Sequence, residues 1–176
     1  KKEKTALRGR EPVRPTDIIK TLQTKQKKMF LSAGKVEGEL TGKIALVAST
    51  DIHDYGKELV KSLCNKAGAE VFDLGTYVTV EEIIENLLET ESKVVIVSTY
   101  NGIALSFAKD LIAALKENHM EDVTLIMGGL LNENLDGSQL AVDVTEELRA
   151  LGVNCDNEME TIVPAIKKIY EGTYQK

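Results

Sequence analysis

The sequence predicts an α/β fold in which a doubly wound, parallel five-stranded sheet follows a short N-terminal helical arm. Short runs of apolar residues recur along the chain, and such runs are typical of strands buried on both faces. Segments with helical spacing alternate with these runs, which favours right-handed crossovers between parallel strands. The 176 residues are enough for one domain with a substantial core and an appendage.

Five segments are predicted to be strands. The clearest is apolar without a break from Val94 to Val97, whereas the last holds only three residues. Each is short and is followed by a polar or glycine-containing stretch, as expected at the end of a strand. In chain order the predicted strands cover 43–49, 70–74, 93–98, 123–127 and 153–155.

Helices are predicted between these strands. Gly68 ends the first of them, and Thr79 with Glu82 forms a capping box at the start of the second. The predicted helices cover 54–67, a segment after Thr79, 103–117, 138–151 and 158–171, and an earlier one begins at Thr16 or Asp17. This alternation is typical of a flavodoxin-like or Rossmann-like domain, in which ligands bind beyond the carboxyl ends of the strands.

Charge divides the chain into a basic arm with its linker, residues 1–42, and an acidic domain, residues 43–176. Residues 1–43 hold 12 Lys and Arg against 5 Asp and Glu, whereas the remainder holds 10 against 23. The arm has a single aromatic, Phe30, and the acidic domain would repel a phosphate backbone. We therefore expect no nucleic-acid partner.

Neither a membrane span nor a disulfide framework is predicted. No apolar run approaches the ~18 residues that a transmembrane helix needs. Cys64 and Cys155 stand alone in apolar surroundings, as buried thiols of a reducing compartment do. These features predict a cytoplasmic protein.

The loop after the first strand contains a candidate metal ligand. Asp51 precedes His53 by two residues, so its carboxylate can accept the proton of one ring nitrogen and leave the other free for a metal. Gly56 would let the next helix begin close to a bulky ligand. A single loop histidine is by itself a weak signal.

Two further loops fall at the same predicted edge of the sheet. The third strand ends in the hydrogen-bonding side chains of Ser98, Thr99 and Tyr100. The fourth ends in Gly128 and Gly129, and a glycine pair permits close backbone approach to a planar or extended ligand. The coincidence of three such loops indicates a binding site there.

On these residues the sequence resembles the vitamin B12 (cobalamin)-binding domain family, and its motifs are most similar to those of corrinoid proteins of methyltransferase systems. That family carries a D-x-H-x-x-G loop after the first strand, a serine-containing loop after the third and a Gly-Gly pair after the fourth. Here the three elements are Asp51 to Gly56, Ser98 to Tyr100, and Gly128 with Gly129, within roughly 43–170.

The resemblance implies cobalamin, as methylcobalamin or adenosylcobalamin, bound base-off/His-on. The cofactor's dimethylbenzimidazole would leave the cobalt, its nucleotide tail would enter a slot at the sheet edge, and His53 would become the metal ligand. Asp51, which would orient His53, is the one residue with an implied catalytic role. The implied cofactor-binding residues are Thr50, Asp51, Ile52, His53, Asp54, Gly56, Ser98, Thr99, Tyr100, Gly128, Gly129 and Leu130.

The chain departs from the family pattern at two places. The serine loop usually has Leu two residues on, where Tyr100 stands here. Mutase-type domains often carry a Gly-Pro-Gly-Thr-like turn after the fifth strand, but this chain has Cys155 to Glu158 instead. We therefore assign no tail contact to that turn.

Two corrinoid functions remain open, and with them the question of whether the chain acts as an enzyme. One is a methyl carrier between partner methyltransferases, which the stretches His53–Lys57 and Asp73–Val78 favour. The other is the B12-binding subunit or domain of an adenosylcobalamin-dependent mutase. Gly129–Gly152 is similar to small mutase subunits, and the 42 preceding residues allow one helix rather than the bundle that usual methyl carriers have. In both cases a partner would cover the upper face.

Alternatives in other classes have less support. Sensing or storage of cobalamin is a third corrinoid function. A flavodoxin-like receiver would use Asp51 and Asp54 but needs a lysine at the end of the fourth strand, and an NAD-binding module needs G-x-G-x-x-G after the first strand. The sequence contains neither feature.

Overall fold

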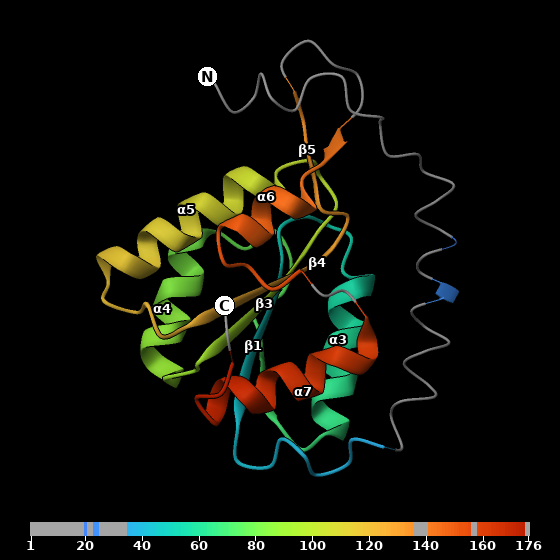
Figure 1. Cartoon of the computed structure of the whole chain (residues 1–176), viewed down its shortest axis with the longest axis vertical. Coiled ribbons are helices and arrows are strands. Elements are labelled where there is room, and N and C mark those ends of the chain that lie inside the picture. The colour runs from blue at the N-terminus through green and yellow to red at the C-terminus, as the bar shows by residue number, and fades with distance from the viewer. Residues whose placement is uncertain (1–19, 21–22, 25–34, 136–140, 156–157, 175–176) are drawn as a thin grey trace.

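The centre of the molecule is a parallel sheet, in agreement with the predicted doubly wound α/β fold. The computed structural model describes residues 20, 23–24, 35–135, 141–155 and 158–174. The sheet has the strand order β2-β1-β3-β4, and Figure 1 shows the strands crossing the middle of the domain. The strands are β1 (Ile44–Ser49), β2 (Glu70–Asp73), β3 (Val94–Thr99) and β4 (Thr124–Gly129).

The predicted fifth strand at 153–155 is reduced to a single parallel bridge between Asn154 and Ile126. The Asn154 N–H donates to the Leu125 carbonyl at 2.9 Å, and its own carbonyl accepts the Met127 N–H at 2.9 Å. Gly152, with φ +82°, turns the chain immediately before this segment. A single paired residue is too short to form a strand. In the described residues the parallel sheet therefore has four strands.

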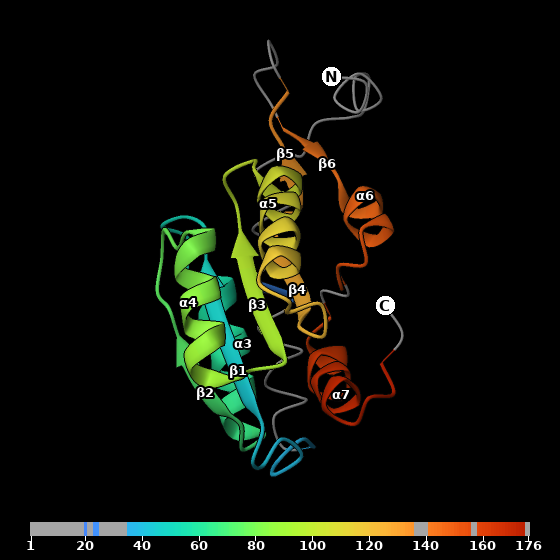
Figure 2. The same cartoon turned by 90° about the vertical axis from the view of Figure 1, so that its left-hand side faces the viewer.

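Helices cover both faces of the sheet, and the pattern of the strands explains why (Figures 1 and 2). Successive side chains of a strand point to opposite faces. Leu46 and Ala48 accordingly belong to one core cluster, and Ala45 and Val47 to the other. The first cluster is covered by α4 (Val80–Thr90), α5 (Ala104–Glu117) and α6 (Thr145–Ala150), and the second by α3 (Tyr55–Lys66) and α7 (Met159–Tyr170).

The capping box predicted for the helix after Thr79 is confirmed. The Glu82 N–H donates to the Thr79 hydroxyl at 3.2 Å, and the Thr79 N–H donates to the Glu82 carboxylate at 2.8 Å. Both donors at the start of α4 are thereby satisfied, which fixes where the helix begins.

The predicted helix at 138–151 is wrong over its described first half. There, β6 (Val142–Asp143) pairs antiparallel with β5 (Asn132–Glu133). Val142 and Val144 are buried while Asp143 is exposed, which is the period-two pattern of a strand. The Asp143 carboxylate then accepts the Thr145 N–H at 3.0 Å, so α6 starts only at Thr145.

Most of the helix predicted from Thr16 or Asp17 lies outside the described residues, although Lys20, Gln23 and Thr24 are helical. The segment 35–42, predicted as a linker, packs on the domain. Leu40 is fully buried in the cluster beneath α3, and its N–H donates to the Ala67 carbonyl at 2.7 Å.

The opposite edge of the sheet, at the amino ends of the strands, is held by Tyr170. Its hydroxyl donates to the Ile44 carbonyl at 2.6 Å and accepts the N–H groups of Ile44 and Lys93, each at 3.2 Å. One phenol from the last turn of α7 thus satisfies the beginnings of two central strands.

Two further expectations concern the chain as a whole. Cys64 and Cys155 are free and buried, as predicted, and burial raises the pKa of the Cys64 thiol to about 12. Within the described ranges, every helix is too short or too polar to cross a membrane.

Candidate functional site

The parallel register brings the three predicted loops to one edge of the sheet. Ser49 of β1 pairs with Ser98 of β3, and Ser98 and Thr99 pair with Gly128 and Gly129 of β4. The loops that leave these strands therefore start side by side at their carboxyl ends.

The predicted contact between Asp51 and His53 is present. One carboxylate oxygen of Asp51, Oδ1, lies 2.8 Å from His53 Nδ1 and accepts the His53 backbone N–H at 2.7 Å. The Asp51 side chain is only 6% exposed, whereas that of His53 is 66% exposed. In the described part of the chain no group bonds the other ring nitrogen, Nε2. In the neutral tautomer that donates from Nδ1 to Asp51, Nε2 is a free electron-pair donor.

The second oxygen of Asp51, Oδ2, is held by the neighbouring loop. It accepts the Tyr100 backbone N–H at 2.7 Å and lies 3.5 Å from the Thr50 hydroxyl. A buried carboxylate requires such donors to offset its desolvation. Asp51 therefore joins the loops after β1 and β3.

Asn101 joins the same two loops, although the sequence analysis did not assign it to the site. Its Oδ1 accepts hydrogen bonds from the Thr50 and Thr99 hydroxyls at 3.4 and 3.3 Å. Ser49 was also missed, and its hydroxyl donates to the Asp51 carbonyl at 3.0 Å. Since these contacts join separate loops or involve a backbone carbonyl, residue spacing gives no signal for them.

Ser98 and Gly56 face one another across the gap between β3 and the first turn of α3. The Ser98 Oγ atom is buried and has no hydrogen-bond partner among the residues that the structure describes. A Cβ atom added to Gly56 would lie 2.9 Å from this oxygen. Such a hydroxyl can bond a polar group of a ligand, and glycine at position 56 is required because any side chain would collide with this oxygen.

Gly129 requires glycine for two reasons. Its φ is +92°, and an added Cβ atom would lie 2.4 Å from the Thr99 carbonyl oxygen. The same Thr99 oxygen accepts the Leu130 N–H at 2.7 Å. The glycine thus lets the loop after β4 fold tightly against the end of β3.

The ring of Tyr100 packs against His53. The two ring centroids are 5.6 Å apart, with an angle of 35° between the ring planes. The Tyr100 side chain is partly buried. Burial, with the negative charge of Asp51, raises the pKa of the Tyr100 phenol to about 12.

The remaining predicted residues of the first loop are exposed. The Ile52 side chain is 64% exposed, beside the exposed imidazole. Asp54 precedes α3 as its N-cap residue but forms no side-chain capping bond. Both therefore lie on the outer surface of this edge.

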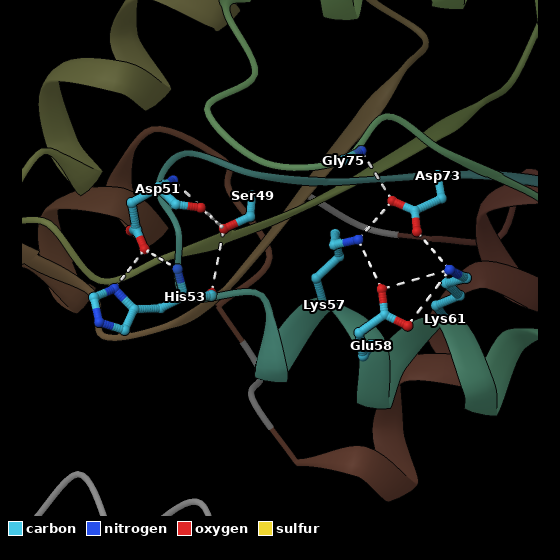
Figure 3. A network of polar contacts seen from close by, with 8 residues as sticks. All are labelled: Ser49, Asp51, His53, Lys57, Glu58, Lys61, Asp73 and Gly75. Atoms are coloured by element: carbon cyan, nitrogen blue, oxygen red, sulfur yellow. Dashed lines mark hydrogen bonds and ion pairs between the residues drawn. The ribbon is translucent and has the colours of Figure 1, made fainter.

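A second polar cluster lies beside the site, as Figure 3 shows. Lys57, buried in the first turn of α3, bonds Asp73 at 2.7 Å and Glu58 at 2.8 Å. Lys61 bonds the other Asp73 oxygen at 2.6 Å, and the Gly75 N–H donates to Asp73 at 2.9 Å. Burial raises the pKa of Asp73, but the hydrogen bonds from both lysines and from Gly75 outweigh it and lower that pKa to about 2.

The side chains described at this edge suit a metal ion that a bound cofactor already coordinates, rather than a bare metal ion. Over the described ranges, no group of three or more His, Cys, Asp or Glu side chains could hold a metal ion. A single imidazole can instead complete the coordination of a metal carried in a planar macrocycle. The buried Ser98 hydroxyl without a partner fits a polar tail of the same ligand.

Comparisons with known proteins also indicate a site for a corrinoid. A family model described as "B12 binding domain" matches residues 42–147. Monomethylamine corrinoid protein 2 of Methanosarcina acetivorans is 33% identical over 121 residues, which is 66% of this chain and 56% of that protein. The glutamate mutase sigma subunit of Carboxydothermus hydrogenoformans is 31% identical over 106 residues, covering 60% of this chain and 75% of that subunit.

A solved structure shares the fold. A cobalamin-binding protein from Desulfitobacterium hafniense DCB-2 superposes with a TM-score of 0.57 at 26% identity, covering 78% of this chain and 61% of that one. This chain thus spans a little over half of the methylamine corrinoid protein and three-fifths of the solved one.

Proposed function

Since the chain belongs to the B12-binding domain family and is a corrinoid-binding protein, we propose that it holds cobalamin base-off with His53 as the lower ligand of the cobalt. The observation that supports this most is the pair formed by buried Asp51 and exposed His53, joined at 2.8 Å. The carboxylate favours the tautomer with its proton on Nδ1 and orients the imidazole. Nε2 then points its electron pair away from Asp51.

The nucleotide tail would lie along Ser98. Its buried hydroxyl lacks a partner, which is costly unless a ligand bonds it, and Gly56 has no side chain to collide with this oxygen. When bound, the corrinoid supplies the chemistry at cobalt, either methyl transfer or homolysis of a cobalt–carbon bond. The protein sets the axial ligand and its surroundings.

Between these two, we favour the methyl carrier. The two stretches that resemble the methyltransferase form, His53–Lys57 and Asp73–Val78, are one unit in the structure, because Lys57 bonds Asp73 at 2.7 Å. In this proposal separate methyltransferases dock on the upper face and exchange the methyl group. Two buried free thiols support a cytoplasmic location.

A mutase subunit is the second candidate, which the match to the glutamate mutase sigma subunit supports. The two functions require different partners. A methyl carrier should turn over only when methyltransferase proteins are added, with methyl donor and methyl acceptor consumed in equal amounts. Isomerase activity on mixing with an adenosylcobalamin-dependent large subunit would decide for the mutase.

Paramagnetic resonance tests the axial ligand directly. The protein is loaded with cobalamin, reduced to Co(II) and labelled with ¹⁵N-histidine, which changes the cobalt–nitrogen splitting if histidine is the ligand. The chain has two histidines, so His119→Asn is the matched control; asparagine suits the left-handed backbone at φ +58°. His53→Ala should abolish the protein-derived splitting and His119→Asn should keep it. If the ¹⁵N-dependent, protein-derived splitting survives in His53→Ala, His53 is not the ligand and the proposal is contradicted.

A further inference from the structure

We propose that Tyr100 is a positioning residue whose ring fixes the plane of the His53 imidazole before cobalt binds. The proposal rests on the proposed role of His53 as axial ligand. It concerns the side chain at position 100, where a tyrosine replaces the leucine that usually stands two residues after the serine of this loop.

His53 needs a second constraint because one hydrogen bond does not fix a ring. The bond from Nδ1 to Asp51, at 2.8 Å, sets the position of one ring atom but leaves the ring free to pivot about it. The side chain is 66% exposed, so little else restrains it. The Tyr100 ring, with its centroid 5.6 Å away and tilted by 35°, is the aromatic contact that removes this freedom.

Tyr100 can position the imidazole because its own backbone and its own ring are both held in place. Its backbone N–H donates to Asp51 at 2.7 Å, and the preceding Thr99 is the last residue of β3 and fully buried. Its ring also lies close to Gly129, whose added Cβ would come within 3.1 Å of Cε2. One residue thus holds the carboxylate through its backbone and the imidazole through its ring.

The ring, rather than the hydroxyl, carries this role. Across the described residues the Tyr100 hydroxyl has no hydrogen-bond partner, whereas its ring contacts His53. Phenylalanine should therefore replace Tyr100 without loss, and leucine should not. Aromatic pairs contribute ~0.5–1.5 kcal/mol beyond the area they bury, which corresponds to roughly a three- to tenfold weaker His–cobalt equilibrium in Tyr100→Leu.

The test compares Tyr100→Leu and Tyr100→Phe in the full chain with aquocobinamide, a corrinoid without a nucleotide tail. This probe isolates ligation by His53 from insertion of the tail. The readouts are the affinity from absorption titration and the fraction of Co(II) that shows nitrogen splitting from protein. Tyr100→Leu should bind three- to tenfold more weakly and show a smaller fraction of split Co(II) signal, and Tyr100→Phe should match the wild type. Tyr77→Leu makes the same change at an exposed tyrosine and should have no effect.

Nuclear magnetic resonance of the unliganded wild type gives a second readout that needs no variant to fold. The His53 ring protons should show Overhauser contacts to Tyr100 and an upfield ring-current shift, which Tyr100→Phe should keep. Absent contacts, wild-type ligation in Tyr100→Leu, or a loss in Tyr100→Phe equal to that in Tyr100→Leu would overturn the proposal. If His53→Ala leaves the cobalt spectrum unchanged, the proposed function itself fails, so the two failures are distinguishable.

Discussion

Asp51 connects the site because both of its oxygens accept hydrogen bonds in a buried position. Oδ1 holds the backbone and the ring of His53, and Oδ2 holds the backbone of Tyr100. An asparagine has the same shape but only one acceptor oxygen, and its NH₂ group is a donor. In either orientation that NH₂ would face an N–H group instead of accepting from it.

Asp51→Asn should therefore weaken both the fold and cobalt ligation. We expect the free energy of unfolding in urea to fall by about 1–3 kcal/mol, the cost of a buried donor without a partner. Nitrogen ligation of Co(II) should weaken about 10- to 100-fold, as is common when the group supporting a metal ligand is lost. Asp110→Asn, at an exposed carboxylate of α5, is the control. Equal ligation in the two variants would show that Asp51 does not hold His53.

Ser98→Phe tests the path of the nucleotide tail. The bulky side chain would displace the first turn of α3, which packs on Ser98 through Gly56, and should lower the affinity for cobalamin by more than about tenfold. Binding of cobinamide, which has no tail, should be nearly unchanged, because His53 remains in place. Urea denaturation must show that the variant folds, since overpacking costs ~1–3 kcal/mol. If both corrinoids bind as to the wild type, the tail does not pass Ser98.

At the scale of elements, the cluster of Lys57, Lys61, Glu58 and Asp73 ties α3 to the end of β2. Lys57 is buried, and its burial lowers its pKa, but its bonds to Asp73 and Glu58 outweigh this and leave the pKa raised. Lys57 and Asp73 therefore stay charged at neutral pH. It fixes the first turn of the helix that begins two residues after His53.

Asp73 makes this anchoring depend on pH. Its pKa is about 2 in the folded protein against 3.8 ordinarily, so the stabilisation is complete above pH 3.8 and is lost as the pH falls from 3.8 to 2. Because Asp73 is partly exposed, solvent screening reduces the stabilisation from this shift to about 1 kcal/mol. Urea denaturation between pH 5 and 2 should show this loss in the wild type and in Asp110→Asn, an exposed control, but not in Asp73→Asn. An equal acid slope in all three proteins would exclude Asp73 as its source.

Local signals predicted most elements, and the failures have physical causes. Apolar runs and the Thr79 cap are properties of neighbouring residues, so the four main strands and α4 were predicted from them. The segment 142–144 was assigned to a helix because its strand pattern depends on pairing with 132–133, ten residues earlier. The Asp51–His53 contact followed from spacing, whereas the bond from Tyr100 to Asp51 spans 49 residues and leaves no local trace.

On the scale of the whole molecule, the binding edge and the Tyr170 contacts lie at opposite ends of the same strands. The hydroxyl of Tyr170 bonds the beginnings of β1 and β3, whereas His53 and Ser98 lie where these strands end. Stability and binding should therefore be separable by mutation.

Tyr170→Phe should lower stability without changing corrinoid affinity. Removal of the hydroxyl leaves the N–H groups of Ile44 and Lys93 and the Ile44 carbonyl without this partner. We expect the free energy of unfolding to fall by about 1–3 kcal/mol, measured in urea, while the cobalamin titration stays as in the wild type. Tyr77→Phe, at an exposed ring, should change neither. A matching loss of affinity in Tyr170→Phe would contradict the separation.

The amide that holds Asp51 belongs to the main chain of Tyr100, and this affects how the site can change over generations. Every residue except proline carries such an N–H. Mutations of codon 100 can therefore exchange the group that packs on His53 while the carboxylate stays anchored. Natural variation can explore the environment of the imidazole at this codon, and among single substitutions only proline would release Asp51 as well.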